Sequence, residues 1–473
     1  MRLTDARMYD RVLASDASCN GRFFLGVLTT GIYCLPGCTA RKPKRENVRF
    51  FPTCKAARAA GLRPCRKCHP DDFARGADPV LESIETLVAE VRGRPADFGD
   101  VRAVVRRSGF GASRVFELFR LHYQTTPAEL LVQARLAHAR WALVDGNASV
   151  ADVAFAAGFA SVSVFYDHFC RRTGLTPTDY RALPGKTMFT VNLPADYSLA
   201  YLRRALGRDP QSVTEKLAGD RYTCAIRIAA APVRLTFDLL PTAITVTTTG
   251  DAVASHRIVA ALLGLEQDAA AFARLAAKLG LARLVKGRAG LRLAQVPSVF
   301  DGLLWAIIGQ QINFPFACLL KRRLIERAGT PLGQGLFAPP TPAAVAALDP
   351  AELVALKFSR QKAAYLIGTA RLITAGQLEV ETLASLSATR VERTLLAMRG
   401  LGPWSVNYLM MRALGFADCV PYGDTGVTSG LQTLFKLEVR PDVDATRHLM
   451  AVFAPYRSLA TAHLWQLNQP PPS

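Results

Sequence analysis

The chain has 473 residues, half of them hydrophobic, which is enough for about two to four domains that each bury a core. Its 58 lysines and arginines outnumber its 38 aspartates and glutamates, giving a formal net charge of +20. Such a surplus, clustered along the chain, favours a nucleic acid partner over an acidic small molecule. The N-terminus lacks the apolar segment of a secretory signal, and no apolar run could span a bilayer. We therefore expect no membrane partner and a cytoplasmic protein.

Four of the ten cysteines form two close pairs, C-x3-C at Cys34 and Cys38 and C-x2-C at Cys65 and Cys68. Each pair can place two sulfurs on one ion, so four thiolates around one tetrahedral Zn²⁺ are predicted. Lysines and arginines crowd both pairs, which indicates that the zinc thiolates face a phosphate backbone. The alternative is a structural zinc site without chemistry. The basic residues predicted to contact DNA here are Arg41, Lys44 and Arg45.

The residues around the cysteines, TTGIYCLPGCTARKPKRENVRFF and AAGLRPCRKCHP, carry a family resemblance. They resemble the N-terminal domain of Ada-type DNA-alkylation response regulators over most of residues 1–76. The resemblance implies that one zinc-bound thiolate accepts a methyl group from a methylphosphotriester in damaged DNA. Cys34 stands at the position of that methyl acceptor.

Residues 77–183 contain an internal repeat. SGFGASRVF at 108–116 recurs as AGFASVSVF at 157–165, and each copy continues to a Thr-Pro, at Pro127 and Pro177. A short helix, a glycine turn and a second helix are typical of helix-turn-helix units. Two such units on a connecting helix resemble the AraC-type DNA-binding domain, and the alternative is a helical domain that only packs. Recognition helices near 112–122 and 161–171 would enter the major groove, with Ser113, Arg114, Ser161, Ser163 and Tyr166 facing the bases.

The pattern changes after a predicted linker at 184–186. Segments 221–228, 233–239 and 243–249 alternate apolar and polar residues, which predicts an antiparallel β subdomain over 187–254. From about 255 to 473 the apolar spacing is helical. The fold class predicted for the whole chain is multidomain α+β, with a small zinc domain, an all-α helix-turn-helix domain, and then this sheet and a helical domain.

The segment LLAMRGLGPWSVNY at 395–408 predicts two helices joined by a G-x-G turn. Gly400 and Gly402 would let the backbone approach a DNA phosphate, and the second helix begins with free N–H groups. With Asp424 downstream, this helix-hairpin-helix pattern resembles the helix-hairpin-helix DNA glycosylase superfamily. GLRL at 290–293, IIGQQI at 307–312 and the C-terminal segment 456–465 narrow the resemblance to AlkA-type alkylpurine DNA glycosylases.

This second resemblance implies roles for individual residues. A glycosylase flips the target nucleotide out of the duplex, and Asp424 would stabilise the positive charge that builds on the deoxyribose or activate water. Trp404 and Tyr408, one helical turn apart, would line a pocket that favours cationic methylated purines by cation–π attraction. Tyr201 would add an aromatic ring from the sheet subdomain. Gln311 stands where some members insert a leucine into the duplex.

Departures from related patterns narrow the expected chemistry. Trp404 occupies the position of the nucleophilic lysine of bifunctional relatives, so no lyase step is expected. Only Cys419 lies beyond Cys318, so no iron–sulfur cluster is expected. A Pro-Cys-His-Arg motif is absent from the sequence, so direct reversal of O6-methylguanine is not expected. Thr425 stands where some members of the superfamily have a bulky side chain, so the sequence does not fix the width of the base-binding pocket.

The combined prediction is a DNA-alkylation response protein. The methylated zinc domain would switch on transcription at promoter DNA, with RNA polymerase as a partner and the chain as a monomer. The C-terminal part would be a monofunctional glycosylase that excises alkylated purines such as 3-methyladenine. One alternative is an activator whose glycosylase-like part binds DNA without catalysis. Another, a redox- or metal-responsive regulator, explains the cysteines but not residues 187–467.

Overall fold

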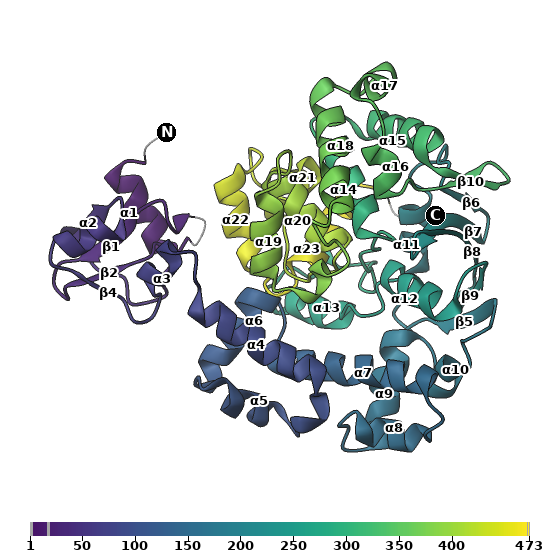
Figure 1. Ribbon diagram of the computed structural model, residues 1–473, viewed down its shortest axis with the longest axis horizontal. Helices are drawn as coiled ribbons and strands as arrows, with labels where there is room; N and C mark the ends of the chain where they lie inside the picture. The colour runs from purple at the N-terminus through teal and green to yellow at the C-terminus, as the bar shows by residue number, and fades with distance from the viewer. Residues whose placement is uncertain (1–2, 17–18, 471, 473) are drawn as a thin grey trace. The chain divides into compact units, whose positions relative to one another are not determined.

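The computed structural model describes residues 3–16, 19–470 and 472. The chain folds as two compact units, Met1–Val88 and Ala89–Ser473 (Figure 1). A four-cysteine cluster, a helical region and sheets followed by further helices confirm the predicted α+β class. Within the described ranges, every helix is too short or too polar to cross a membrane.

The N-terminal unit is built around a four-stranded sheet in the order β3-β1-β2-β4. Its strands are antiparallel except for the pairing of β2 with β4. Phe24, Tyr33 and Phe51 are buried in its core, and α2 begins after the capping side chain of Thr53. The elements are α1 Asp5–Leu13, β1 Phe24–Val27, β2 Ile32–Cys34, β3 Val48–Phe51, α2 Cys54–Ala59, β4 Arg63–Pro64 and α3 Pro70–Ala74.

Two helix-turn-helix units follow, formed by α5 with α6 and by α8 with α9, and the long helix α7 joins them. The helices α6 and α9 cover the two segments predicted as recognition helices. Both end on a residue in the left-handed conformation, Gln124 after α6 and Gly174 after α9. The elements are α4 Pro79–Gly93, α5 Val101–Ser108, α6 Ala112–Tyr123, α7 Pro127–Asp145, α8 Val150–Ala156, α9 Val162–Thr173 and α10 Pro177–Arg181.

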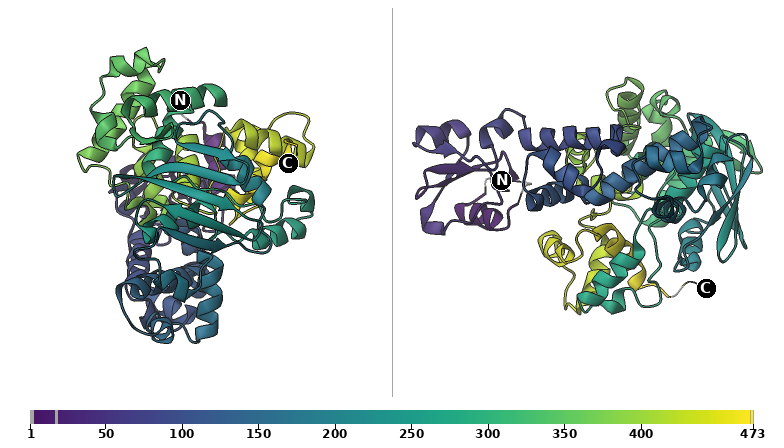
Figure 2. Two further views of the ribbon diagram at one scale, coloured as in Figure 1. Left: turned by 90° about the vertical axis from the view of Figure 1, so that its right-hand side faces the viewer. Right: turned by 90° about the horizontal axis from the view of Figure 1, so that it is seen from below.

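A five-stranded antiparallel sheet comes next, in the order β5-β9-β8-β7-β6 (Figure 2, left). Buried and less buried residues alternate along β8, which is the periodicity that predicted this strand. Two outer strands and one helix escaped the prediction. The elements are β5 Met188–Asn192, α11 Leu199–Leu206, β6 Glu215–Ala218, β7 Arg221–Ile228, β8 Ala231–Leu239 and β9 Ala243–Thr248.

One hydrophobic core runs from the second helix-turn-helix unit into this sheet and α12. At the junction, the backbone N–H of Asn192 donates to the carbonyl of Gly174 at 2.8 Å. The buried His256 places Nε2 2.7 Å from the carbonyl of Thr173. These contacts join residues on the two sides of the predicted linker 184–186. The second helix-turn-helix unit is therefore packed onto the β5 edge of the sheet.

The remainder is helical except for one small hairpin. The prediction of helix alone beyond 255 is wrong at β10 Thr330–Gly333 and β11 Leu336–Ala338, which pair with each other and contact β7 and β8. Pro331, Gly333 and Gly335 explain the exception, because they disfavour a helix there. The helices are α12 Ala252–Leu262, α13 Ala269–Lys278, α14 Val299–Ile308, α15 Phe314–Ala328, α16 Pro342–Ala346, α17 Pro350–Ala355, α18 Arg360–Thr374, α19 Ala388–Leu396, α20 Pro403–Arg412, α21 Thr425–Phe435, α22 Val443–Ala451 and α23 Arg457–Leu467.

The junction at Gly174 generates a stability prediction. Gly174 has φ +68°, and an added Cβ would lie 2.4 Å from Val191 Cγ1 and 2.8 Å from the Asn192 carbonyl oxygen. Gly185 has φ +75° but open space around it. Both alanine variants carry the left-handed penalty of roughly 1–2 kcal/mol. Gly174→Ala should lose about 1–3 kcal/mol more, because the packed junction must open. Denaturant unfolding of the two variants checks this, and equal losses would contradict the packed junction.

Candidate metal centre and hairpin site

The four predicted cysteines come together in the N-terminal unit. Their Sγ atoms all lie within 4.8 Å of one another, and Cys34, Cys38 and Cys65 are buried. Cys34 ends β2, and Cys65 follows β4, so the parallel pairing of these strands brings the two cysteine pairs together. The N–H of Leu35 points at the sulfur of Cys68 at 3.3 Å. Four sulfurs at this spacing, with N–H donors around them, form a site for one tetrahedral Zn²⁺ and confirm the predicted ligand set.

The proton chemistry of the cluster fits a metal site. Hydrogen bonding to Cys38 and to the other two cysteines raises the pKa of Cys34 far above its ordinary value. The hydrogen bond with Cys34 lowers the pKa of Cys38 to about 7. Thiols packed this closely share protons, and a divalent cation replaces those protons with one positive centre. The donor set is therefore suited to a thiolate-binding metal.

Two lysines lie against the turn that carries the first cysteine pair. Lys42 donates from Nζ to the Cys38 carbonyl at 2.6 Å, and Lys67 donates to the Thr39 carbonyl at 3.2 Å. Burial lowers the pKa of Lys42. Both lysines belong to the basic residues that crowd the cysteine pairs in the sequence and were expected to face a phosphate backbone, although neither is among the three named as individual DNA contacts. Only the fold shows that their ammonium groups reach this turn.

The three basic residues predicted to contact DNA differ in their surroundings. Arg41 is exposed, and Lys44 is exposed with Glu46 3.9 Å away. Arg45 forms an ion pair with Asp5 at 3.4 Å and lies over two aromatic rings. Arg45 therefore also holds α1 to the sheet, whereas Arg41 and Lys44 have more open positions.

In the first helix-turn-helix unit, the predicted DNA-facing residues lie at the start of α6. Ser113 is exposed. Arg114 forms an ion pair with Glu117 at 2.7 Å, one turn further along the same helix. The guanidinium of Arg114 is therefore already paired in the free protein.

In the second unit, Ser161 caps α9, because its hydroxyl accepts the N–H of Val164 at 3.3 Å. Ser163 is exposed, and Tyr166 is half-buried with its ring edge-on to Phe165. Of the two serines predicted to face DNA, Ser163 is exposed to solvent and Ser161 stabilises the N-terminal end of α9.

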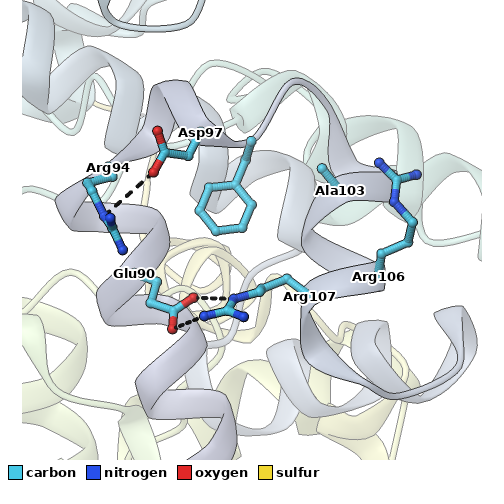
Figure 3. A pocket seen from close by; sticks show the side chains of 7 residues that line it. Glu90, Arg94, Asp97, Ala103, Arg106 and Arg107 are labelled. Carbon is cyan, nitrogen blue, oxygen red and sulfur yellow. Dashed lines mark hydrogen bonds and ion pairs between the residues drawn. The ribbon is translucent and has the colours of Figure 1, made fainter.

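A hollow lies between the end of α4 and the start of α5 (Figure 3). Glu90 binds Arg107 through two hydrogen bonds of 2.7 and 2.8 Å, and Arg94 pairs with Asp97 at 3.5 Å. Both acids that line it are thus neutralised within the hollow. The lining residues are Glu90, Arg94, Asp97, Phe98, Ala103, Arg106 and Arg107, and they include no predicted site residue.

The predicted hairpin is formed by α19, the turn after it and α20 (Figure 1). Gly400 needs to be glycine, because its φ is +97° and an added Cβ would lie 2.5 Å from the ring of Tyr365. The side chain of Gln310 fixes this turn by donating to the Gly400 carbonyl at 2.7 Å and to Ser405 Oγ at 3.0 Å. Gly402 is exposed at the N-cap of α20, so the first N–H groups of that helix are open to a phosphate.

Asp424 is the N-cap of α21 and is held by three N–H donors. Its Oδ1 accepts the backbone N–H of Val427 at 3.0 Å and the indole N–H of Trp465 at 2.9 Å. Its Oδ2 accepts the indole N–H of Trp404 at 3.2 Å. Both oxygens of this half-buried carboxylate are thus oriented by the protein.

Two of the predicted aromatic residues, Trp404 and Tyr408, lie beside this carboxylate. Trp404 and Tyr408 stack with ring centroids 5.3 Å apart, and Tyr408 lies 6.3 Å from Trp465. Tyr201, on α11, packs against the same hydrophobic cluster. Trp465 is a site residue that sequence reasoning missed, although it lies in the C-terminal segment that carried the resemblance.

Two glycines on α21 let Trp465 reach Asp424. An added Cβ at Gly426 would lie 2.7 Å from Trp465 Cδ1, and one at Gly430 would lie 2.7 Å from the Leu464 carbonyl oxygen. The close approach of α21 to α23 therefore depends on the absence of side chains at these positions.

Gln311 lies in the turn between α14 and α15. It is exposed, and its φ of +55° is unusual for a residue other than glycine. The neighbouring Gln310 ties this turn to the hairpin. The predicted inserting residue and the predicted phosphate-binding turn are therefore parts of one surface.

Three family models match the chain. The metal-binding domain of Ada matches residues 7–71, a helix-turn-helix domain matches 104–183, and the HhH-GPD superfamily of base excision DNA repair proteins matches 304–455.

Relatives match parts or all of it. A "Probable bifunctional transcriptional activator/DNA repair enzyme AlkA" from Mycobacterium tuberculosis is 27% identical over 98% of each chain. A DNA-3-methyladenine glycosylase from Bacillus subtilis is 33% identical over 38% of this chain, which spans 60% of that protein. A 3-methyladenine DNA glycosylase structure from Archaeoglobus fulgidus has a TM-score of 0.53 at 21% identity, over 59% of this chain and 99% of that one, and so shares the fold. The chain therefore joins a metal-binding domain of the Ada type, a helix-turn-helix domain and an HhH-GPD base excision repair domain, which is the composition of an Ada–AlkA fusion.

Proposed function

We propose that this chain senses methylated DNA through Cys34, activates transcription, and excises alkylated purines such as 3-methyladenine with Asp424. The observation that carries the excision is the carboxylate of Asp424, held by Trp404 and Trp465 next to the helix-hairpin-helix turn. The names of the Bacillus and Mycobacterium relatives support two of these three activities, base excision and transcription activation. The observation that carries the sensing is the cluster of four sulfurs.

For excision, the hairpin around Gly402 would bind a phosphate, and the flipped nucleotide would place its sugar at Asp424. As the bond from C1′ to the base breaks, the electron pair leaves with the base and the sugar gains positive charge. The oriented carboxylate stabilises that charge, and water adds to C1′ to give an abasic site. The residue at 404 is a tryptophan, so the sugar is not captured by a lysine amine there.

Two features of the aromatic group favour a cationic base. Trp404 and Tyr408 are stacked, and Trp465 and Tyr201 belong to the same cluster. Ring faces attract a methylated, positively charged purine more strongly than a neutral one. Gln311, at the exposed turn, would enter the duplex where the flipped nucleotide leaves.

For sensing, the sulfur of Cys34 would attack the methyl carbon of a methylphosphotriester. The S–C bond forms, the C–O bond breaks, and the electron pair of the C–O bond stays on the phosphate as an ordinary diester. Bound zinc supplies the charge that keeps the sulfur a thiolate at neutral pH. Arg41, Lys42 and Lys44 would hold the neighbouring phosphates beside the cluster.

The remaining partners follow from these roles. Double-stranded DNA is the partner of the helix-turn-helix and HhH-GPD domains. Ser113, Arg114, Ser163 and Tyr166 would contact promoter DNA, and RNA polymerase would be recruited to that promoter. We propose that the protein acts as a monomer in the bacterial cytoplasm.

Zinc content tests the metal centre. The purified chain should hold one tightly bound zinc, and Cys65→Ala should lose it and unfold the N-terminal domain. Cys54→Ala is the matched control, because Cys54 lies outside the cluster and donates to the Pro70 carbonyl at 3.4 Å. Elemental analysis and proteolysis of both variants check this. Full zinc content in Cys65→Ala would contradict the four-cysteine site.

Asp424→Asn tests the excision. The amide should still bind duplex DNA, while release of 3-methyladenine should fall by about 10²-fold or more, because a neutral group cannot stabilise the cationic sugar. Single-turnover base release and DNA affinity are measured side by side. Release from the variant equal to that from the wild type would contradict the role of Asp424, and a wild type that releases no base would support the non-catalytic, DNA-binding alternative. A borohydride-trapped protein–DNA adduct would contradict the monofunctional chemistry.

Methylation of Cys34 tests the switch. The transfer turns a thiolate into a neutral thioether, so the site loses about one negative charge while the basic side chains stay. Affinity for duplex DNA at fixed low salt should rise about fivefold, since one unit charge near a phosphate is worth about 1 kcal/mol in water. The gain should shrink as salt is added. Cys34→Ala should show no change after exposure to methylphosphotriester DNA, and equal affinities of the methylated and unmethylated wild type would rule the switch out.

A further inference from the structure

The two helix-turn-helix repeats differ at the residue that ends their recognition helices. Gln124 follows α6 with φ 54° and ψ 28°, and Gly174 follows α9 with φ 68° and ψ 7°. Each stands just before the Thr-Pro that opens the next helix, so the two positions correspond. Glycine adopts this left-handed conformation freely, whereas glutamine is strained in it. A strained residue in place of glycine indicates that its side chain makes a contact the protein needs.

The side chain of Gln124 contacts the backbone that leads to Asp424. Its Oε1 accepts the N–H of Asp418 at 2.8 Å, and its Nε2 donates to the sulfur of Cys419 at 3.4 Å. Cys419 is buried, which raises the pKa of its thiol to about 12 and keeps it neutral as an acceptor. One amide from the helix-turn-helix region thus holds two consecutive residues of the HhH-GPD domain.

The segment from Asp418 to Asp424 is fixed at almost every step. Asp418 accepts two hydrogen bonds of 2.7 Å from the guanidinium of Arg457. The N–H of Cys419 donates to Ser458 Oγ at 3.0 Å, and the N–H of Asp424 donates to the Pro421 carbonyl at 3.0 Å. Loss of the Gln124 contacts at Asp418 and Cys419 would therefore loosen one end of the short segment that leads to the carboxylate.

The same helix also touches the hairpin. The buried His122, the second-last residue of α6, places Nδ1 2.9 Å from Thr389 Oγ1 on α19, and α6 packs along α19 (Figure 1). The end of α6 thus contacts both the first hairpin helix and the Asp424 segment. These are the two parts that the proposed excision requires to be in register.

We propose that Gln124 is a positioning residue for base excision: from the end of the first recognition helix, it holds the segment 418–424 and with it the Asp424 carboxylate. The inference rests on the proposed excision by Asp424. It also means that the first helix-turn-helix unit is a structural part of the repair site.

Gln124→Gly tests this inference, because glycine relieves the strain while removing the amide. If Gln124 only ends α6, the variant should be as stable as the wild type or more so, and equally active. If it positions the Asp424 segment, the single-turnover rate of 3-methyladenine release in the full chain should fall about 10- to 100-fold, while DNA affinity stays within about twofold. Lys436→Gly is the matched control, since Lys436 also ends a helix in the left-handed conformation, with φ 54°, and is exposed.

Hydrogen exchange provides a readout that does not need activity. In Gln124→Gly the amides of 418–424 should exchange faster, and in Lys436→Gly they should not change. An unchanged excision rate in Gln124→Gly would overturn the inference, whatever the exchange shows. A wild type that releases no base would contradict the proposed excision instead, and unchanged exchange at 418–424 would then still overturn the role of Gln124.

Discussion

The proposed repair site depends on the Asp424 carboxylate, and the orientation of this carboxylate is a result of helix packing. Trp404 on α20 and Trp465 on α23 each direct an indole N–H at it, and the first turn of α21 supplies the third donor. Trp465 can reach the carboxylate only because Gly426 leaves room for its ring. Three helices must therefore pack correctly before a single acid can act. Charge-assisted hydrogen bonds fix both its oxygens and prepare them for charge on a sugar rather than for solvent.

The helix-turn-helix repeats are joined to this repair domain at both of their corresponding ends. The second repeat packs against β5 through Gly174, and one hydrophobic core includes both α9 and the sheet. The first repeat packs against α19 and holds Asp418 through Gln124. The helix-turn-helix region and the HhH-GPD domain thus lie in one compact unit, Ala89–Ser473, so the proposed promoter reading and base excision would share one packed body.

The cysteine cluster shows what local spacing can establish. Two short cysteine motifs were enough to predict the four ligands, because a metal requires its donors at close range whatever the rest of the fold does. The helix-turn-helix repeat and the G-x-G hairpin were likewise readable, since their turn residues lie next to one another in sequence. The chain's α+β class followed from the change of periodicity between these segments.

Other features depend on contacts between distant segments, and the sequence could not reveal them. Trp465 meets Asp424 only after α21 and α23 pack, and Gln124 meets Asp418 only after two domains dock. Arg45 was predicted to contact DNA, but in the fold its guanidinium forms an ion pair with Asp5. The β10–β11 hairpin was hidden in a region whose helical periodicity is strong on both sides.

One chain is proposed both to accept methyl groups and to excise methylated bases, and a single measurement on the wild type tests both activities together. The protein is incubated with methylated duplex DNA, and the released bases are separated by chromatography. The mass of the peptide that contains Cys34 is then measured by mass spectrometry. We predict free 3-methyladenine together with an added mass of one methyl group on Cys34. Intact bases together with an unmodified Cys34 would contradict the account.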